Sequence, residues 1–343
     1  MKRYNTVITA TIVDEYLNKL KDYCDIKVIG WAKTGVLMSE EELEEELKEA
    51  EIFIVGYEMI TESLLKKLSK LKVIACTRAN PVNIDLKATE KLGIPVIYAP
   101  GRNSNSAAEF TMGLLLSEVR HIGRAFHALK KGEYVGKEVD DINNYVEKDD
   151  VVWNLSGESP YKKFKGYELS GRTIGFIGLG NIAIRLVNLC KAFNMDIIAY
   201  DPYCCRENAE KLGVKLLDLN ALLSTADFVS INCKVSSETK GLIGKEQLSM
   251  MKPSAYLINT ARAAIIVQDA LIDALTNKRI AGAALDVFWD EPIPTNHPLL
   301  QLDNVTITPH IAGASKDVAR AHSMMVVSDI IAWINGEKPV RVI

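Results

Sequence analysis

Short runs of β-branched and aromatic residues alternate along the chain with longer segments in which apolar residues recur every three or four positions. The first pattern predicts buried strands and the second predicts amphipathic helices, so their alternation indicates an α/β protein with parallel sheets. The strands predicted in the first hundred residues are 6–10, 26–29, 52–55, 73–76 and 95–98. From residue 172 onward they are 173–177, 197–200, 228–231, 255–259, 282–285 and 305–307.

Three segments show clear helical periodicity. In residues 39–50, Ser39 and Glu42 are spaced as a capping box, and a run of acids follows. Those acids suggest either a metal- or protein-binding patch or a solvated helix face, and the inward leucines favour the solvated face. Residues 106–127 are predicted to form one long helix, and residues 316–335 the last helix.

The segment 132–171 is polar and irregular, with aromatic residues spread along it. A stretch of this length without periodicity is functional, forms an interface, or is disordered. The aromatic side chains favour an arm that packs against another surface over free disorder. They are Tyr134, Trp153, Tyr161, Phe164 and Tyr167.

Composition and charge limit the classes of partner that the protein is expected to bind. The 343 residues include 41 Lys and Arg against 44 Asp and Glu, a net charge of −3. This balance argues against nucleic-acid binding by phosphate neutralisation and against a polybasic membrane segment. No apolar run has the length of a membrane span, the first residues lack an export signal, and the six cysteines lack zinc-type spacing. We therefore expect a cytoplasmic protein of about two domains, with no metal, membrane or nucleic-acid partner.

The segment 172–201 is the most informative for cofactor binding. Its first predicted strand runs into the turn GLGNIA, which opens a helix. Gly178 permits a tight turn, Gly180 lets the backbone approach a pyrophosphate, and Ala183 permits close packing of helix on strand. The N–H groups at the start of the helix can bind the anion. This order of elements predicts a dinucleotide-binding unit.

The residue that ends the second strand of this unit bears on the cofactor. Asp201 lies 21 residues after Gly180, where a carboxylate can bind the adenosine ribose and would repel a 2′-phosphate. Pro202, not an arginine, follows it. We therefore expect NAD, although the nearby Arg206 leaves NADP open.

Three polar residues follow predicted strands in the second half: Arg262, Glu291 and His310. The carboxyl ends of parallel strands face one ligand crevice, so these side chains are expected on the cofactor's side. A guanidinium can clamp a carboxylate with two hydrogen bonds, and an imidazole can take or give a proton near neutral pH. A carboxylate on the second ring nitrogen would fix the imidazole tautomer and favour its protonated form.

Several segments together resemble the D-2-hydroxyacid dehydrogenases, the family that includes phosphoglycerate, glycerate and hydroxypyruvate dehydrogenases. They are TRANPVNID, YAPGRNSNSAAEFTMGLLL, GLGNIA, NTAR, DVFWDEP and PHIAG. The resemblance implies hydride transfer between NAD(H) and a D-2-hydroxy acid/2-oxo acid pair, an activity like that of phosphoglycerate dehydrogenase, and a homodimer. It makes Arg262, Glu291 and His310 the catalytic residues.

The same resemblance implies the domain layout and the binding residues. A Rossmann NAD-binding domain (105–312) would be inserted into a flavodoxin-like substrate domain (1–104 and 313–343), with an interface arm at about 132–171. Both domains would be doubly wound parallel sheets. The implied cofactor-binding residues are Gly178, Gly180, Asn181, Ile182, Asp201, Pro202, Cys233, Thr260, Ala261, Asp286, His310 and Gly313. The implied substrate-binding residues are Arg78, Ala79, Asn80, Arg102 and Arg262.

Some alternatives stay open. The family is usually glycine-rich at the turn where this chain has Ala79 and Asn80, so the Asn80 side chain could replace backbone donors. Arg78 and Arg102 could bind a second anionic group such as a phosphate, or could pair with local acids. An NADH-sensing interaction protein, like the C-terminal-binding-protein corepressors, is the alternative function. A formate dehydrogenase is disfavoured because that branch usually has Gln in place of Glu291.

Overall fold

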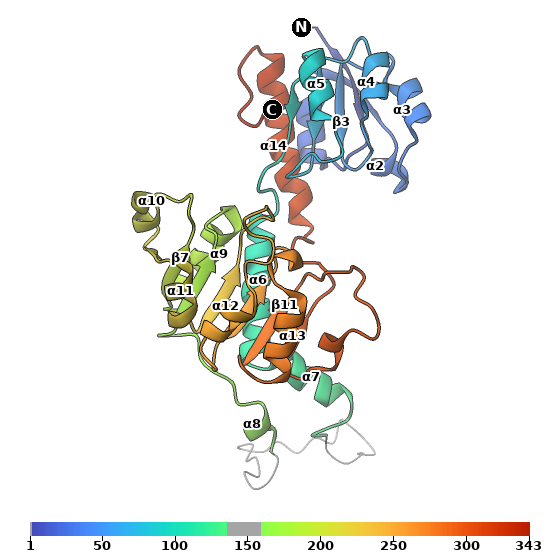
Figure 1. Ribbon diagram of the computed structural model, residues 1–343. Helices are drawn as coiled ribbons and strands as arrows, with labels where there is room; N and C mark the ends of the chain where they lie inside the picture. Colours follow the sequence, from blue (N-terminus) through green and yellow to red (C-terminus); the bar gives the residue numbers. More distant parts are fainter. Residues whose placement is uncertain (1, 136–158) are drawn as a thin grey trace, which may run out of the picture. The chain divides into compact units, whose positions relative to one another are not determined.

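The computed structural model describes residues 2–135 and 159–343. They form two compact units (Figure 1). Unit 1 comprises Met1–Ser106 and Gly313–Ile343, and unit 2 comprises Ala107–Ala312. The first boundary lies two residues beyond the one that the sequence suggested, inside a helix.

Unit 1 is built on five parallel strands in the order β2-β1-β3-β4-β5, the flavodoxin-like order. The strands are β1 (Tyr4–Ile8), β2 (Cys24–Val28), β3 (Ile52–Val55), β4 (Val73–Cys76) and β5 (Val96–Ile97). The helices are α1 (Asp14–Lys21), α2 (Trp31–Thr34), α3 (Glu40–Leu47), α4 (Glu62–Lys67), α5 (Leu86–Leu92) and α14 (Asp317–Ile334). β3 and β4 are buried along their whole length because helices cover both faces of the sheet.

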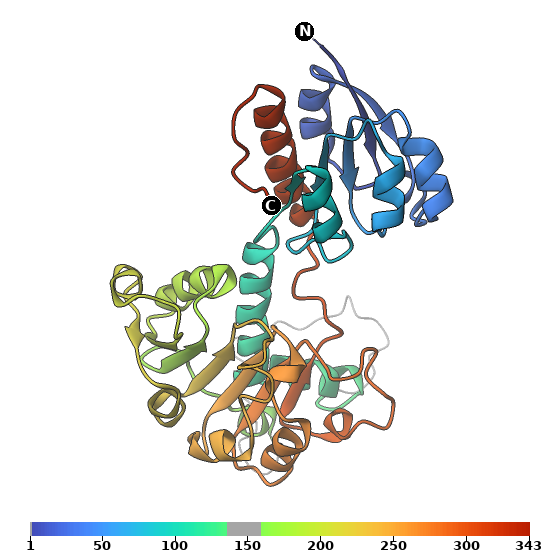
Figure 2. The same ribbon diagram turned by 45° about the horizontal axis from the view of Figure 1, so that its top comes forward.

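The C-terminal segment completes unit 1. α14 packs beside α1 and against the sheet (Figure 2), and its Val326, Val327 and Ile330 are fully buried in the same core cluster as Leu20. Each such aliphatic side chain contributes about 1.5–3 kcal/mol when fully buried. After α14 the chain forms an antiparallel bridge from Val342 to β5. The first and last parts of the chain therefore fold as one unit.

Unit 2 has seven parallel strands in the order β12-β11-β10-β9-β6-β7-β8. They are β6 (Thr173–Ile177), β7 (Asp196–Tyr200), β8 (Lys215–Leu216), β9 (Phe228–Ile231), β10 (Tyr256–Asn259), β11 (Gly282–Leu285) and β12 (Val305–Ile307). α6 (Ser104–Val119) and α9 (Asn181–Ala192) contribute to one core cluster. α11 (Leu219–Thr225), α12 (Lys245–Met250) and α13 (Gln268–Thr276) contribute to the other. The remaining helices are α7 (Ile122–Lys130), α8 (Pro160–Lys163), α10 (Arg206–Lys211) and two 3₁₀ turns, Ala263–Ile265 and Pro298–Gln301. The predicted doubly wound α/β class is thus confirmed for both units.

The predicted long helix over 106–127 is wrong. α6 ends at Val119 and α7 begins at Ile122, because His121 adopts a left-handed conformation with φ 56°. The His121 backbone N–H donates to the Glu118 carbonyl (3.2 Å), and its ring Nδ1 lies 2.9 Å from the same oxygen, so this residue satisfies the end of α6. The apolar pattern continued past the break through Ile122 and Phe126, and both residues are exposed.

The predicted arm at 132–171 is described only in part. Its described residues include the short helix α8, and the rings of Tyr134 and Phe164 meet edge to face with centroids 5.9 Å apart. Tyr161 and Tyr167 are exposed. Trp153 lies outside the described residues. An interface role for this segment stays a prediction.

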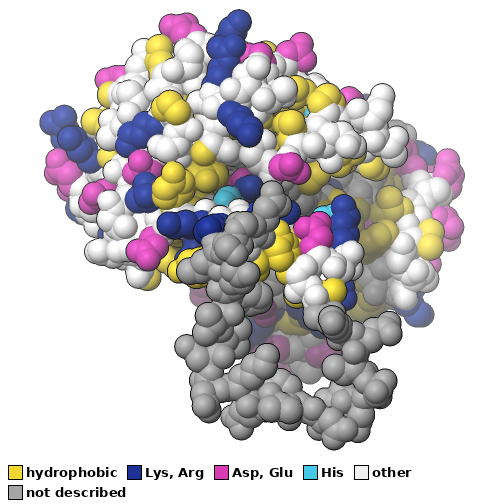
Figure 3. Space-filling model, turned by 90° about the horizontal axis from the view of Figure 1, so that it is seen from below, with side chains coloured by type: hydrophobic (Ala, Val, Ile, Leu, Met, Phe, Trp, Pro, Cys, Tyr) yellow, Lys and Arg dark blue, Asp and Glu magenta, His cyan; other side chains and the backbone are white. Residues whose placement is uncertain are grey.

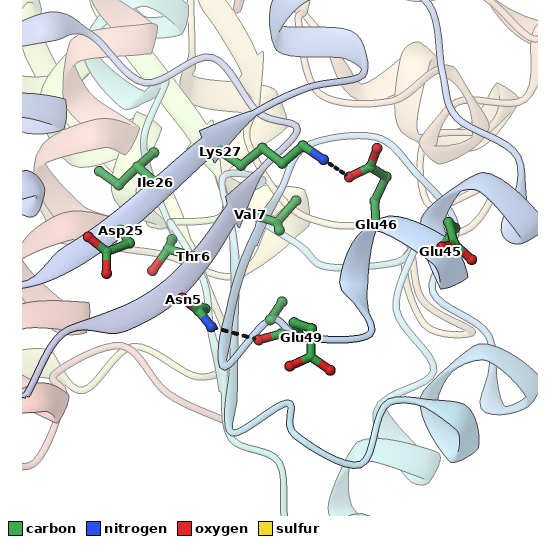
Figure 4. Close-up of a pocket in the computed structure, with 10 residues that line it drawn as sticks. Asn5, Thr6, Val7, Asp25, Ile26, Lys27, Glu45, Glu46 and Glu49 are labelled. Carbon is green, nitrogen blue, oxygen red and sulfur yellow. Dashed lines mark hydrogen bonds and ion pairs between the residues drawn. The ribbon is translucent and has the colours of Figure 1, made fainter.

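The acidic helix α3 is a solvated helix face, as the sequence favoured. Ser39 and Glu42 form the predicted capping box, and Leu43 and Leu47 are buried. Its acids pair with neighbouring lysines, including Lys67 with Glu44 at 2.7 Å. Figure 4 shows the hollow between α3, β1 and β2, where Lys27 meets Glu46, and no predicted site residue lines it. Among the described residues no group of His, Cys, Asp or Glu is arranged to hold a metal.

Charged side chains of both signs are interspersed over the face seen in Figure 3, in keeping with the nearly balanced composition. Among the described helices, none combines the length and apolar character that a membrane crossing requires.

Candidate active site

The strand order reverses between β6 and β9 in unit 2. In open parallel sheets ligands bind beyond the carboxyl ends of strands at such a point. The Gly178 turn follows β6, and Cys233 follows β9. The two loops touch there, because a Cβ placed on Gly178 would lie 2.9 Å from the Cys233 backbone nitrogen. The sequence motif and the topology therefore indicate the same place.

The turn after β6 fits a dinucleotide pyrophosphate. Gly178 has φ 95°, a left-handed value that only glycine adopts without strain, and the contact with Cys233 excludes any side chain. Gly180 is the N-cap of α9 and is exposed, and no described side chain caps the helix. Asn181 is exposed and Ile182 half-buried. The first turn of α9 thus presents its backbone N–H groups beside open backbone, as anion binding requires.

Asp201 is held at the carboxyl end of β7 by backbone donors. One carboxylate oxygen accepts from the Leu179 N–H (2.7 Å), and the other accepts from Tyr203 (2.9 Å) and Cys204 (3.1 Å). The carboxylate therefore orders the GLGNIA turn and its own loop. Pro202 is exposed beside it, and Arg206 begins α10.

Cys233 is not arranged as a nucleophile. Its side chain is half-buried, and burial raises the pKa of the thiol. The nearby Asp201 acts in the same direction, against a weaker backbone hydrogen bond that lowers the pKa. The thiol is therefore protonated near neutral pH, which agrees with its expected place in the wall of the cofactor site.

Arg262 follows β10 in a turn shaped by a buried asparagine. The Asn259 side chain accepts from the Ala261 N–H (3.0 Å) and donates to the Arg262 carbonyl (2.9 Å). The neighbouring Thr260 hydroxyl lies 2.7 Å from that of Thr111 on α6. The Arg262 side chain is exposed, with one guanidinium nitrogen 2.6 Å from the Ala261 carbonyl. The turn is fixed while most of the guanidinium is open to a ligand.

Glu291 and His310 form the hydrogen bond that the sequence predicted. His310 Nδ1 lies 2.6 Å from Glu291 Oε2, and the other carboxylate oxygen accepts from the Phe288 N–H at 3.0 Å. Burial raises the pKa of Glu291, but these hydrogen bonds and the positive charge of Arg262 outweigh it and leave that pKa below its ordinary value. Among the described residues, no hydrogen bond engages the second ring nitrogen of His310.

Asp286 holds the loop that carries His310. Its side chain is fully buried, and its carboxylate accepts from the Thr308 hydroxyl (2.6 Å), the Ile311 N–H (2.9 Å) and the Ala312 N–H (2.7 Å). His310 itself has φ 56°, so the loop keeps a conformation that costs energy for a non-glycine residue. The cofactor role predicted for Asp286 is untested, and in this structure its carboxylate binds the loop.

In unit 1 the predicted substrate residues follow β4 and β5. The Arg78 guanidinium lies over the Tyr57 ring, 5.5 Å from its centroid. Ala79 is half-buried and Asn80 is exposed, with the Asn80 carbonyl bonded to the Val82 N–H (2.9 Å). The Arg78 carbonyl accepts from the Ala99 N–H at 3.0 Å, which ties the two loops together.

Arg102 is bonded to a histidine that the sequence analysis did not assign. Its Nη1 lies 3.0 Å from Nδ1 of His322 on α14. Within residues 2–135 and 159–343 neither Arg102 nor Arg78 forms an ion pair with a carboxylate, so pairing with local acids is wrong for the described residues. Gly313, the last predicted cofactor residue, lies in unit 1, where a Cβ would clash with the Asn103 side chain at 2.7 Å.

Asn259 and His322 are the site residues that sequence reasoning missed. Asn259 is the last residue of β10, and a polar residue ending an apolar strand just before Arg262 was the available signal. His322 lies in an apolar helix 220 residues from its partner, and no local pattern indicates that contact.

Comparison with known proteins gives the family. The sequence model described as "D-isomer specific 2-hydroxyacid dehydrogenase, NAD binding domain" matches residues 112–312. The chain is 38% identical to a D-3-phosphoglycerate dehydrogenase of Methanocaldococcus jannaschii, over 91% of this chain and 55% of that protein. It is 33% identical to a glyoxylate reductase of Aeropyrum pernix, over 99% and 95%.

Solved structures agree with the sequence relatives. An acyclic imino acid reductase, solved in complex with NADPH and D-Arg, matches with a TM-score of 0.73 at 26% identity, over 98% of this chain and 99% of that one. The chain spans about half the length of the phosphoglycerate dehydrogenases it matches. On these matches the chain belongs to the D-isomer specific 2-hydroxyacid dehydrogenase family.

Proposed function

We propose that this protein is an NAD-dependent dehydrogenase that interconverts a D-2-hydroxy acid and its 2-oxo acid, in the manner of a phosphoglycerate dehydrogenase. The observation that carries the proposal is the Glu291–His310 hydrogen bond in the same unit as Arg262 and the glycine turn after β6. A proton-transfer pair, a carboxylate clamp and an anion-binding turn are the parts that this reaction needs.

Each residue has a defined task. In oxidation His310 takes the proton of the substrate hydroxyl on its free ring nitrogen, while Glu291 holds the ring and stabilises the imidazolium. Arg262 binds the substrate carboxylate and polarises the carbonyl oxygen. In reduction the imidazolium returns the proton. A nicotinamide cofactor, when bound, accepts or supplies the hydride.

We assign NAD as the cofactor, bound by Gly178, Gly180 and the first residues of α9, with Asp201 toward the ribose. The Asp201 carboxylate would repel a 2′-phosphate, and no arginine follows it directly. The relative solved with NADPH makes this a choice to measure.

The experiment is steady-state absorbance with NADH or NADPH and a panel of 2-oxo acids: glyoxylate, pyruvate, hydroxypyruvate and 3-phosphohydroxypyruvate. We expect turnover of at least one, with NADH preferred. Arg262→Ala should abolish turnover while NADH still binds, as followed by cofactor fluorescence. No turnover of any acid, together with NADH-dependent capture of a protein partner, would favour the sensing function instead.

We also propose a homodimer. α7 presents Ile122, Phe126 and Leu129 outward, at 56%, 65% and 53% exposure, along one helix face beside the start of the proposed arm. Apolar side chains at this spacing are usually covered by a partner. Light scattering that gives the mass of one chain would contradict the dimer.

A further inference from the structure

His322 carries no role in the mechanism above, yet it is a buried titratable residue of unit 1. It lies on α14 with 6% of its surface exposed. Both ring nitrogens are bonded: Nε2 lies 2.7 Å from the Thr11 carbonyl, and Nδ1 lies 3.0 Å from Nη1 of Arg102. The ring therefore bridges the loop after β1 and the loop after β5.

The partners fix the protonation state of the ring. A carbonyl oxygen can only accept, so Nε2 carries the hydrogen toward Thr11. A guanidinium can only donate, so Nδ1 of His322 presents its lone pair to Arg102. The imidazole is neutral. Burial lowers the pKa of His322, with the Thr11 hydrogen bond opposing and the charge of Arg102 assisting, which agrees with this state.

The contact with His322 orients the Arg102 guanidinium without neutralising its charge. A carboxylate partner would have neutralised the guanidinium, whereas a neutral imidazole holds one nitrogen and leaves the positive charge uncompensated. Arg102 is half-buried, and its remaining N–H groups can bind an anion in a fixed plane. An arginine side chain loses rotamer entropy when it binds a ligand, so prior anchoring lowers the cost of binding.

A second cation lies on the adjoining loop. The Arg78 carbonyl accepts from Ala99, and the Ala99 carbonyl accepts from the Arg102 N–H at 3.4 Å, so one chain of backbone bonds connects the two arginines. Arg78 is itself placed against Tyr57. Both arginines are thus held by neutral rings at the carboxyl ends of β4 and β5.

We propose that His322 is a positioning residue, which orients Arg102 to bind a second anionic group of the substrate, a phosphate or a second carboxylate. The inference rests on the proposed function and names the substrate class: 2-oxo acids with two negative groups. Arg102 would bind the second anionic group of such a substrate through the N–H groups that His322 leaves free.

The test compares two replacements of His322 in the full chain. His322→Phe keeps a ring and removes both nitrogens, whereas His322→Gln keeps one acceptor and one donor. For 3-phosphohydroxypyruvate or 2-oxoglutarate, His322→Phe should raise KM about 10-fold with little change in kcat, as expected for loss of one hydrogen bond to a charged group. The KM for glyoxylate, which has a single carboxylate, should change far less. His322→Gln should recover most of the loss, and equal thermal melting of the variants checks folding.

A double-mutant cycle separates positioning from a general structural effect. In an Arg102→Ala background, His322→Phe should have no further effect on KM, because its action passes through Arg102. An equal effect in both backgrounds, or equal KM changes for glyoxylate and the two-anion acids, would overturn the inference. The phosphate and dicarboxylate arms show which anion is preferred.

A binding measurement keeps the inference apart from the proposed function. Isothermal titration with 3-phosphoglycerate or 2-oxoglutarate needs no turnover, so a wild-type chain that reduces no 2-oxo acid refutes the dehydrogenase alone. The inference that His322 positions Arg102 then stands if His322→Phe weakens that binding about 10-fold. The inference fails if the variant binds as tightly as the wild type, or if the wild type binds neither 3-phosphoglycerate nor 2-oxoglutarate.

Discussion

In each unit a buried carboxylate accepts hydrogen bonds at the carboxyl edge of the sheet, but most of these bonds are shorter in unit 2 than in unit 1. In unit 2 Asp286 accepts three hydrogen bonds of 2.6 to 2.9 Å from the loop that carries His310. In unit 1 Glu58, 1% exposed, accepts one of 2.8 Å from Thr9 and longer ones of 3.4 Å from the Trp31 and Tyr57 N–H groups. In unit 2, short hydrogen bonds therefore hold the loop that carries His310, the residue proposed to transfer the proton. In unit 1, a longer hydrogen bond holds Tyr57, whose ring contacts Arg78, one of the proposed specificity residues.

The two units also differ in the groups that hold their proposed site side chains. In unit 2 His310 is paired with a carboxylate, which suits the proton transfer proposed for this residue. In unit 1 Arg102 and Arg78 are held by an imidazole and a phenol ring, which leave their charge available to a ligand. Under the proposed function, the residues of unit 2 would carry out the reaction and the arginines of unit 1 would select the acid.

The largest expected effect is on the reaction itself. His310→Ala should lower kcat by about 10³-fold, because it removes the proton donor and acceptor. Arg102→Ala should instead act mainly on the KM of acids with two anionic groups. Steady-state kinetics of the two variants measures the difference, and unchanged NADH fluorescence titration is the control. A kcat for His310→Ala within tenfold of wild type would break the assignment of chemistry to unit 2.

The second prediction concerns the two buried carboxylates. Asp286→Ala leaves three donors in the His310 loop without their acceptor, so it should lower the free energy of unfolding by about 3 kcal/mol. Glu58→Ala loses one short bond and two long ones, so it should lower it by about 1–2 kcal/mol. Urea unfolding followed by circular dichroism measures both. Equal losses would remove the distinction between the two edges.

The fold was largely readable from sequence because both sheets are parallel and buried. β3, β4, β6, β9, β11 and β12 have the predicted bounds. All of these except the half-buried β12 are buried along most or all of their length, and such strands are predominantly apolar. β8 was missed because it has two residues on a sheet edge. The break at His121 was missed because one residue in a left-handed conformation leaves the apolar period intact.

The sequence predicted those candidate site residues that come soon after a predicted strand. Arg262 lies one turn beyond a predicted strand, and the Glu291–His310 pair was inferred from what an imidazole base needs. The contact of Arg102 with His322 joins a loop to a helix 220 residues away, so it depends on how α14 packs on unit 1. Such packing leaves no local signal in the chain.

The smallest expected effect concerns the negative charge of Glu291 at the carboxyl edge of the unit 2 sheet. Because the pKa of Glu291 is lowered, its carboxylate is ionised above that value and favours the protonated ring of His310. Glu291→Gln keeps an acceptor and removes the charge, so the imidazolium needed for reduction forms only at lower pH. The pH at which the reduction rate is half-maximal should fall by about one unit, with the maximal rate reduced only a few-fold. Rates of reduction measured from about pH 5 to 9 check this. A fall confined to this variant, and absent in Arg102→Ala, would sharpen the contrast between the units, whereas a shift to higher pH would contradict it.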